Sequence, residues 1–233
     1  RVRAEVSAHV EGISLRLDTE YRIRHRNRTY RWVRTRATSL RDDNGRAYRM
    51  AGTQNDVTEA KLVDRLTGLP NRSLFLERND QAITLCKERA GDPFAVIVIR
   101  IHDWDRFKQS YGQGFCDRLL VEPADRLSAP VRPRDTVACL GENSFGVLVL
   151  NVETPDQAQA TFARIRDRVA RPFVVDGSEI QPSVEAGIAL GNERYDSAEG
   201  LVDAATVALN STGERADYRA KFYDSELRTQ AVN

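Results

Sequence analysis

The stretch Asp135-Thr-Val-Ala-Cys-Leu-Gly-Glu-Asn-Ser-Phe-Gly-Val-Leu-Val-Leu150 contains two apolar runs separated by a short polar interruption. Two such runs joined by a glycine-containing interruption predict core strands connected by a tight turn. Gly141 can bring the backbone close to a ligand, because glycine carries no Cβ. The segment Gly141–Phe145, which reads Gly-Glu-Asn-Ser-Phe and is called the signature turn below, is therefore a candidate functional turn.

Length and composition predict a globular protein that works in a reducing compartment. The 233 residues suffice for one large domain or two modest ones with a sizeable core. A net charge of +1 predicts no bulk attraction to nucleic acid or to a membrane. No apolar run approaches the ~18 residues of a membrane span, and no signal peptide opens the chain, so we expect a cytoplasmic location without membrane contact. Three widely spaced cysteines favour buried thiols over a disulfide or zinc framework: Cys86, Cys116 and Cys139.

The first sixty residues predict a helix tail followed by three antiparallel strands. Valines at helical spacing mark the helix over 1–12, and alternating side chains mark strands over Leu17–Arg24, Tyr30–Ala37 and Tyr48–Val57. Asn44-Gly45 predicts the second turn, because this pair tolerates positive φ. The many arginines alternate with apolar residues, which favours a solvated sheet face over a nucleic-acid site.

Four strings in this region resemble the C-terminal half of a PAS sensor domain. They are Glu20-Tyr-Arg-Ile-Arg24, Tyr30-Arg-Trp-Val33, Asp43-Asn-Gly45 and Gly52-Thr-Gln-Asn-Asp-Val-Thr-Glu-Ala-Lys61. The resemblance assigns residues 1–58 to part of a PAS domain, without the earlier elements that would complete a ligand pocket. Residues 59–64 are expected to form a helical linker, which either couples the sensor to the output domain or is a plain connection.

The remainder of the chain predicts a mixed helix and strand domain. The continuously apolar run Phe94–Ile101 is typical of a centre strand covered on both faces. Pro70-Asn71 leads into a helix over Ser73–Arg89. Other helices are expected over Asp117–Leu127, Pro155–Ala170 and Ala198–Leu209, a strand pair over Phe173–Leu190, and an edge strand over Phe222–Asp224.

Two motifs in this part resemble the GGDEF family, the diguanylate cyclases that join two GTP molecules into cyclic di-GMP. Asp64-Arg-Leu-Thr-Gly-Leu-Pro-Asn-Arg72 matches the family's opening Asp-x-Leu-Thr-Gly-Leu-x-Asn-Arg, and the signature turn aligns with Gly-Gly-Asp-Glu-Phe. The resemblance implies an α+β fold: a partial PAS antiparallel sheet joined by a short helix to a ferredoxin-like α/β cyclase palm over residues 65–224. Residues 225–233 would begin a helix that could lead into a following domain.

The metal-binding positions of the family carry the wrong residues. Cyclisation requires divalent metals held by carboxylates. By the family's spacing, Arg100 stands at the Asp that ends the centre strand, and Asn143 replaces the metal-binding acid of the signature turn. Ser144 replaces the acid beside it. Glu142, Asp103, Asp105 and His102 are polar neighbours, for which surface roles are favoured over metal binding.

The base and phosphate contacts are altered as well. Lys108 aligns with the guanine-reading Asn, whereas its partner is retained as Asp117. Gly213 and Asp217 stand where the family has the Lys and Arg that hold triphosphate. The resemblance therefore implies degenerate active-site positions, which are Arg100, Lys108, Asp117, Gly141, Glu142, Asn143, Ser144 and Phe145.

One family motif survives just before the signature turn. Arg132-Pro-Arg-Asp135 matches the Arg-x-x-Asp pattern that binds cyclic di-GMP in the family. The resemblance implies that Arg132 contacts phosphate or guanine and that Asp135 accepts hydrogen bonds from the base. Arg164 or Arg166 could supply a second cation. An Arg–Asp pair that braces a loop is the alternative.

These observations favour a regulatory PAS–GGDEF module of bacterial cyclic di-GMP signalling that is not an enzyme and needs no cofactor or metal. Three alternatives stay open: an active diguanylate cyclase with Mg²⁺, a cyclic di-GMP receptor, and a dimerisation and relay module that binds no nucleotide. Candidate partners are cyclic di-GMP, a second copy of the chain and a C-terminal EAL phosphodiesterase domain in the parent protein; nucleic acid is not expected.

Overall fold

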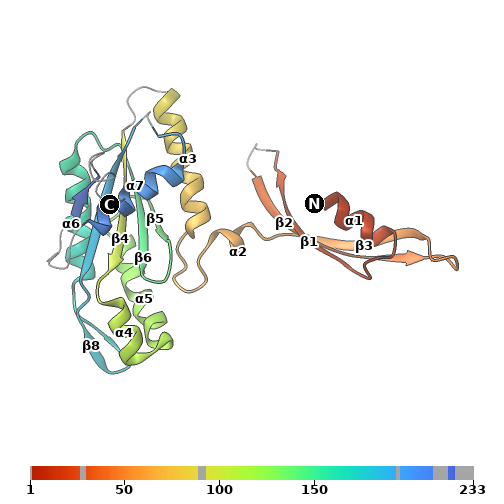
Figure 1. Ribbon diagram of the computed structural model, residues 1–233, viewed down its shortest axis with the longest axis horizontal. Coiled ribbons are helices and arrows are strands. Elements are labelled where there is room, and N and C mark those ends of the chain that lie inside the picture. Colours follow the sequence, from red (N-terminus) through yellow and green to blue (C-terminus); the bar gives the residue numbers. More distant parts are fainter. Residues whose placement is uncertain (1, 27–29, 89–92, 193–194, 212–219, 224–233) are drawn as a thin grey trace. The chain divides into compact units, whose positions relative to one another are not determined.

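The computed structural model describes residues 2–26, 30–88, 93–192, 195–211 and 220–223. Contacts divide the chain into two units, Arg1–Leu62 and Val63–Asn233 (Figure 1). The division falls within the segment 59–64 that the sequence assigns to a linker. Gly213, Asp217 and the tail expected over 225–233 lie outside the described residues.

The N-terminal unit is a three-stranded antiparallel sheet with one helix packed against β1. Its elements are α1 (Val2–Val10), β1 (Leu17–Arg24), β2 (Tyr30–Arg41), β3 (Ala47–Asp56) and α2 (Thr58–Leu62). The three expected strands are confirmed, and Gly45 in the second turn has φ 79°. The buried His9 joins α1 to the sheet, because its ring contacts the Ser14 carbonyl at 2.8 Å and the Ser39 hydroxyl at 3.0 Å.

The second unit is built on a five-stranded sheet in the order β10-β9-β4-β6-β5. Strand β4 lies at its centre and is antiparallel to both neighbours, whereas β10 runs parallel to β9 at one edge. The elements are α3 (Arg72–Glu88), β4 (Phe94–Ile101), α4 (Trp104–Tyr111), α5 (Gln113–Ser128), β5 (Thr136–Cys139), β6 (Ser144–Leu150), α6 (Pro155–Val169), β7 (Phe173–Val175), β8 (Ser178–Ile180), β9 (Val184–Gly191), α7 (Ala198–Asn210) and β10 (Ala220–Phe222).

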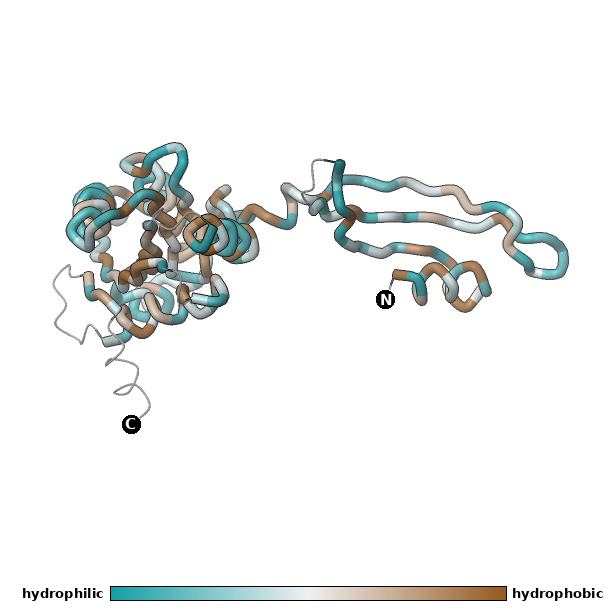
Figure 2. Tube along the Cα trace, turned by 90° about the horizontal axis from the view of Figure 1, so that it is seen from above, coloured by the Kyte–Doolittle hydropathy of each residue, from teal (hydrophilic) through white to brown (hydrophobic). Residues whose placement is uncertain are grey.

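Helices cover both faces of this sheet, which explains why β4 is apolar from Phe94 to Ile99. Ile97, Ile99 and Ile101 pack with α4, α5 and α6, whereas Val96 and Val98 pack with α3 and α7. Successive strand residues point to opposite faces, so a strand that is buried on both must be apolar at every position. The hydrophobic segments accordingly lie at the centre of this unit (Figure 2).

The sequence interpretation missed α4 and placed the start of α5 too late. Trp104 and Phe107 lie one helical turn apart and pack against the core, which is the apolar spacing of an amphipathic helix. The spacing of the family motif runs through the same residues and does not reveal this helical period. The expected helix over Asp117–Leu127 in fact begins at Gln113.

The strand pair expected over Phe173–Leu190 is three strands. β7 and β8 form a small hairpin through Asp176 and Gly177, both with positive φ, and β9 joins the main sheet. Pro182 lies between β8 and β9 and has no backbone N–H, so it separates the two strands.

No helix within the described residues is long and apolar enough to cross a membrane.

The approach of α7 to β9 generates a stability prediction. A Cβ added at Gly187 would lie 1.9 Å from the Ala205 carbonyl oxygen and 2.4 Å from the Leu209 nitrogen. These are backbone atoms, so Gly187→Ala must displace α7 and should cost about 3 kcal/mol. We expect the urea unfolding midpoint of the second unit to fall accordingly.

The matched control is Gly114→Ala within α5, where the nearest atom to the added Cβ is 3.7 Å away. Alanine favours helix over glycine by about 1 kcal/mol, so this variant should unfold at the same urea concentration or a higher one. Equal urea unfolding midpoints for Gly187→Ala and Gly114→Ala would contradict the close packing of α7 on β9.

Candidate functional site

The signature turn connects β5 to β6 beside the end of β4. The Leu140 amide donates to the Ser144 carbonyl at 2.8 Å, which closes the turn, and the Ile101 amide donates to the Asn143 carbonyl at 3.0 Å. The turn and the end of the centre strand, which the sequence interpretation treats as one site, therefore lie together. Phe145 is fully buried and anchors the turn in the core.

The polar side chains of the turn are neutral or face solvent. The Ser144 hydroxyl donates to the Asn143 Oδ1 at 3.1 Å, so the two residues that replace acids bond to each other. Gly141 is exposed, and a Cβ added there would meet no atom within 4 Å. Packing therefore does not require glycine at this position, and its backbone is open to solvent.

Arg100, which the sequence interpretation aligns with a metal ligand of the family, bonds to two other elements. In the sheet it lies opposite Ser144 on β6 and Glu185 on β9. Its Nε donates to the Glu185 carboxylate at 2.7 Å, and its Nη1 donates to the Asn210 Oδ1 at the end of α7 at 2.9 Å. The Glu185 side chain is only 10% exposed, so the Arg100 guanidinium compensates a largely desolvated carboxylate.

Lys108 on α4 contacts the signature turn directly. Its ammonium donates to the Glu142 carboxylate at 2.8 Å. The hydrogen bond to Glu142 raises the pKa of Lys108 above its ordinary value, so Lys108 is charged at neutral pH. The Glu142 side chain thus contacts the ammonium of Lys108, the residue that the sequence interpretation aligns with the family's guanine-reading Asn.

The other acids near the turn are dispersed. Asp117 accepts a hydrogen bond from Gln113 at 2.8 Å, one turn earlier in α5. Asp103 has a left-handed φ of 56° and lies 3.6 Å from the His102 ring. Among the described residues, no group of three or more His, Cys, Asp or Glu side chains is placed to hold a metal ion.

The Arg132–Asp135 turn precedes β5 and is closed by the Asp135 amide, which donates to the Arg132 carbonyl at 2.9 Å. Arg132 is exposed, whereas Asp135 is 8% exposed and its Oδ1 accepts the Leu150 amide at 2.9 Å. Asp135 therefore links the start of β5 to the end of β6. Arg164 is exposed on α6 and donates to the Thr161 hydroxyl at 3.2 Å. Within the described part of the chain, no hydrogen bond joins Arg164 to Arg132 or Asp135.

The opening motif packs next to the signature turn, a contact that the sequence interpretation did not anticipate. Asp64 accepts hydrogen bonds from the amide and hydroxyl of Thr67 at 2.9 and 2.8 Å, which shapes the motif's own turn. The Pro70 carbonyl accepts the Cys139 amide at 2.8 Å, and Asn71 forms a parallel bridge to Cys139. Burial, reinforced by the negative charge of Asp64, raises the pKa of the Cys139 thiol. This pairing could not be read from local sequence.

Comparison with known families gives two matches along the chain. The family described as "Diguanylate cyclase, GGDEF domain" matches residues 61–218, and the family described as "PAS fold" matches residues 1–54. The order of the two matches is that expected from the sequence.

Curated relatives match most of this chain but are much longer. The bifunctional diguanylate cyclase/cyclic di-GMP phosphodiesterase MucR of Pseudomonas aeruginosa is 29% identical over 78% of this chain and 26% of its own length. The diguanylate cyclase TpbB of the same species is 34% identical over 63% of this chain and 34% of its own length. The chain thus spans about a quarter to a third of the length of these relatives.

A solved structure of the TpbB GGDEF domain from Pseudomonas aeruginosa superimposes with a TM-score of 0.68 at 27% identity. The match covers 73% of this chain and 99% of that structure. The fold of the second unit is therefore that of GGDEF domains, and the α+β fold class expected from the sequence is confirmed.

The Arg100–Glu185 contact predicts a stability effect that a double variant can isolate. Arg100→Met removes the cation beside a largely buried carboxylate, and partial exposure of Arg100 limits the expected cost to about 2 kcal/mol. Urea denaturation of the second unit should report this loss. The double variant Arg100→Met/Glu185→Gln should recover most of it, because no uncompensated charge remains.

Lys108→Met serves as the control, since it removes the cation of the exposed Lys108–Glu142 pair. Its unfolding midpoint should stay close to that of the wild type. An Arg100→Met variant that is as stable as Lys108→Met would contradict a compensating role for Arg100.

Proposed function

The chain belongs to the GGDEF family of diguanylate cyclase domains, preceded by a PAS fold, and we propose that it is a regulatory module of bacterial cyclic di-GMP signalling whose GGDEF domain is catalytically inactive. Its role is then to relay or receive a signal rather than to make the nucleotide. The relatives' names place them in cyclic di-GMP synthesis and breakdown, which supports the signalling context.

The observation that carries this proposal is the Arg100 contact with Glu185 and Asn210. Metal-assisted phosphoryl transfer needs divalent cations to neutralise phosphate and lower the pKa of the attacking hydroxyl. Hard cations bind carboxylate oxygens, whereas Arg100 places a fixed positive charge at the strand end where the family has its ligand. A guanidinium there repels a metal ion.

The signature turn supports the same conclusion. Asn143 and Ser144 supply no negative charge, and the remaining acid, Glu142, bonds to Lys108. A metal ion would have to displace the Lys108 ammonium to use that carboxylate. The absence of acids at both family positions therefore leaves no charged pair for Mg²⁺.

The alternative is an active cyclase that makes cyclic di-GMP from two GTP molecules with Mg²⁺. The name of TpbB, a diguanylate cyclase, favours it. Such an enzyme would have to use displaced acids such as Glu142, Asp103 or Asp105.

Incubation of the purified chain with GTP and Mg²⁺ or Mn²⁺ tests this choice. We expect no cyclic di-GMP by chromatography after many hours, because the metal ligands are missing. A parallel incubation with EDTA identifies any metal-independent background. Accumulation of cyclic di-GMP that EDTA abolishes would overturn the proposal and establish the active alternative.

The proposal extends to cyclic di-GMP as a ligand at the Arg132 turn. Arg132 is exposed and its guanidinium can donate a bidentate pair of hydrogen bonds to phosphate or guanine. Asp135 has one carboxylate oxygen committed to Leu150, so its main contribution is to shape the turn that presents Arg132. Arg164 would join this site only if the ligand reaches α6.

Calorimetry with cyclic di-GMP tests this ligand, with GTP as the competing nucleotide. Arg132→Ala should weaken binding about 10- to 100-fold, because it removes charge-assisted hydrogen bonds. Arg134→Ala is the matched control, since Arg134 is an exposed arginine of the same turn at an unspecified position of the motif, and it should bind as the wild type does. No heat from the wild-type chain, or equal losses in both variants, would reject this site.

The remaining expectations concern the parent protein. We propose a cytoplasmic module that works as a homodimer, with an EAL phosphodiesterase domain following it. The name of MucR, which combines both activities, supports the last of these.

A further inference from the structure

A cavity of about 570 Å³ lies beside helix α7 in the second unit. One stripe of the helix lines it, because Gly200, Ala204 and Val207 recur at helical spacing. Two tyrosines complete the wall: Tyr195 precedes α7 in the chain, and Tyr223 follows β10. None of the described residues that line the cavity belongs to β4 or to the signature turn. Its volume is that of a small-molecule site, which typically measures ~300–1,000 Å³.

The two tyrosines supply uncharged aromatic surface that the fold holds in place. Both pack against the core on this side of the sheet. The Tyr223 amide donates to the Ile188 carbonyl of β9 at 2.7 Å, and the Tyr195 amide donates to the Asn192 carbonyl at 3.3 Å. Burial, reinforced by the nearby Tyr223, raises the pKa of Tyr195, so the Tyr195 phenol is neutral at physiological pH.

Two carboxylates belong to the same wall. Asp203 is exposed on α7, and none of the other described residues forms a hydrogen bond or an ion pair with its side chain. Asp196 lies 3.2 Å from the Lys87 ammonium of α3, but the Asp196 side chain is 97% exposed and its carboxylate stays open to solvent. The described lining residues therefore carry two negative charges and no positive charge.

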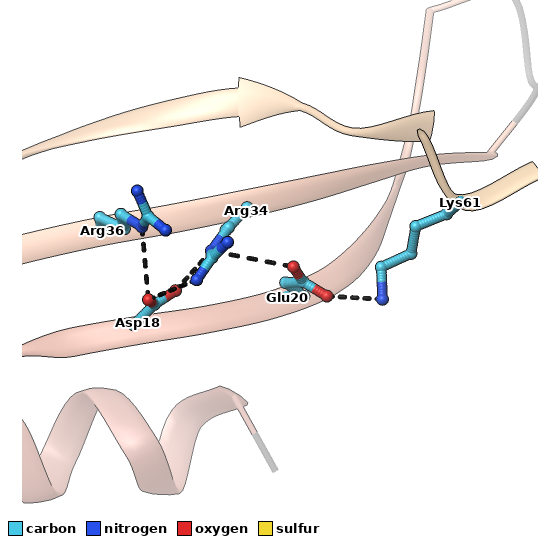
Figure 3. Close-up of polar contacts among 5 residues, drawn as sticks. All are labelled: Asp18, Glu20, Arg34, Arg36 and Lys61. Atoms are coloured by element: carbon cyan, nitrogen blue, oxygen red, sulfur yellow. Dashed lines mark hydrogen bonds and ion pairs between the residues drawn. The ribbon is translucent and has the colours of Figure 1, made fainter. Parts of the chain in front are cut away.

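Acids on another exposed face of the chain are matched by the chain's own cations. On the N-terminal sheet, Asp18 accepts two hydrogen bonds from Arg34 at 2.7 Å, and Glu20 lies 2.5 Å from the Lys61 ammonium (Figure 3). Each of these acids already has a cation partner. Asp203 of the cavity has no such partner in the part of the chain that the structure describes, so its charge is available to a ligand.

Aromatic rings beside carboxylates have the chemistry that recognises organic cations. A guanidinium or an alkylammonium is attracted to the negative face of a tyrosine ring. A carboxylate pairs with the same cation through charge-assisted hydrogen bonds. An anionic ligand would be repelled by the two acids, and a neutral apolar ligand would leave them without a partner. The cavity is therefore suited to a cation with an organic stem.

We propose that this cavity binds a compact organic cation, whose guanidinium or ammonium head contacts Tyr195 and Tyr223 and pairs with Asp203. Asp196 supplies the second negative charge, for which Lys87 competes with the ligand. The cation is either a free small molecule or the side chain of an arginine or lysine on a partner. The proposal does not depend on whether the GGDEF domain is active.

Titration of the full chain followed by amide ¹H–¹⁵N spectra tests this site with three probes. Butylguanidinium should shift amides of residues 195–207 and saturate at millimolar concentration, whereas butylurea, a neutral molecule of the same shape, should leave them unshifted. A capped Gly-Arg-Gly peptide presents the same cation on a backbone. Tighter binding of the peptide than of butylguanidinium assigns the cation to a partner protein, and equal or weaker binding assigns it to a free small molecule.

Two variants should change the affinity for butylguanidinium in opposite directions. Asp203→Asn removes the unpaired charge at constant size and should weaken binding about 10-fold. Lys87→Met removes the competitor for Asp196 and should tighten binding about two- to fivefold. An affinity that Lys87→Met leaves unchanged would overturn the role of Asp196.

Glu199→Gln is the matched control. Glu199 is an exposed acid of the same helix that is not among the described residues lining the cavity, so this variant should bind butylguanidinium as the wild type does. Equal losses in Asp203→Asn and Glu199→Gln would show general charge attraction in place of a site. Shifts with butylurea equal to those with butylguanidinium, or no shift of residues 195–207 with either, would also overturn the proposal.

Discussion

Strand β4 pairs with a neighbouring strand along each edge and is covered by helices on both faces. These contacts fix the positions of the strands and helices of the second unit. Its partners β6 and β9 are fixed in register by backbone pairing, so the residue at its C-terminal end faces set neighbours on each side. Arg100 occupies that end between Ser144 and Glu185. The chemistry available at the site is therefore decided by which side chains the register brings opposite one another.

Those side chains form a site whose charges are balanced within the protein. Arg100 is matched by Glu185 and Lys108 by Glu142, each across a different pair of elements. A site that recruits divalent metals needs an excess of carboxylates that only the incoming cation compensates. Here Arg100 and Lys108 already pair with the carboxylates of Glu185 and Glu142. Such ion pairs within the chain are typical of contacts that support the fold.

Local sequence patterns predict most of the helices and strands but not the contacts between them. The apolar run Phe94–Ile101 and the hairpin after Asp135 were predictable, because strand periodicity and turn residues are short-range signals. Helix α4 has a short-range signal as well, the helical spacing of Trp104 and Phe107. Pro182 likewise marks the break between β8 and β9, because proline has no backbone N–H.

The candidate site was predictable by residue position but not by partner. Arg100 lies one residue before the end of β4, whereas its partners Glu185 and Asn210 lie 85 and 110 residues further along and carry no local signal. The same holds for Asp135, whose bond to Leu150 depends on how β5 pairs with β6. Such contacts follow from strand order and register, which single-sequence patterns leave undetermined.

The cross-strand contact of Arg100 with Glu185 also bears on how this domain can evolve. Replacing the arginine by an acid would set two carboxylates directly opposite each other on neighbouring strands. Like charges in that arrangement destabilise a sheet. An acid at position 100 is therefore compatible with this sheet only when position 185 changes as well, so we expect the two positions to vary together.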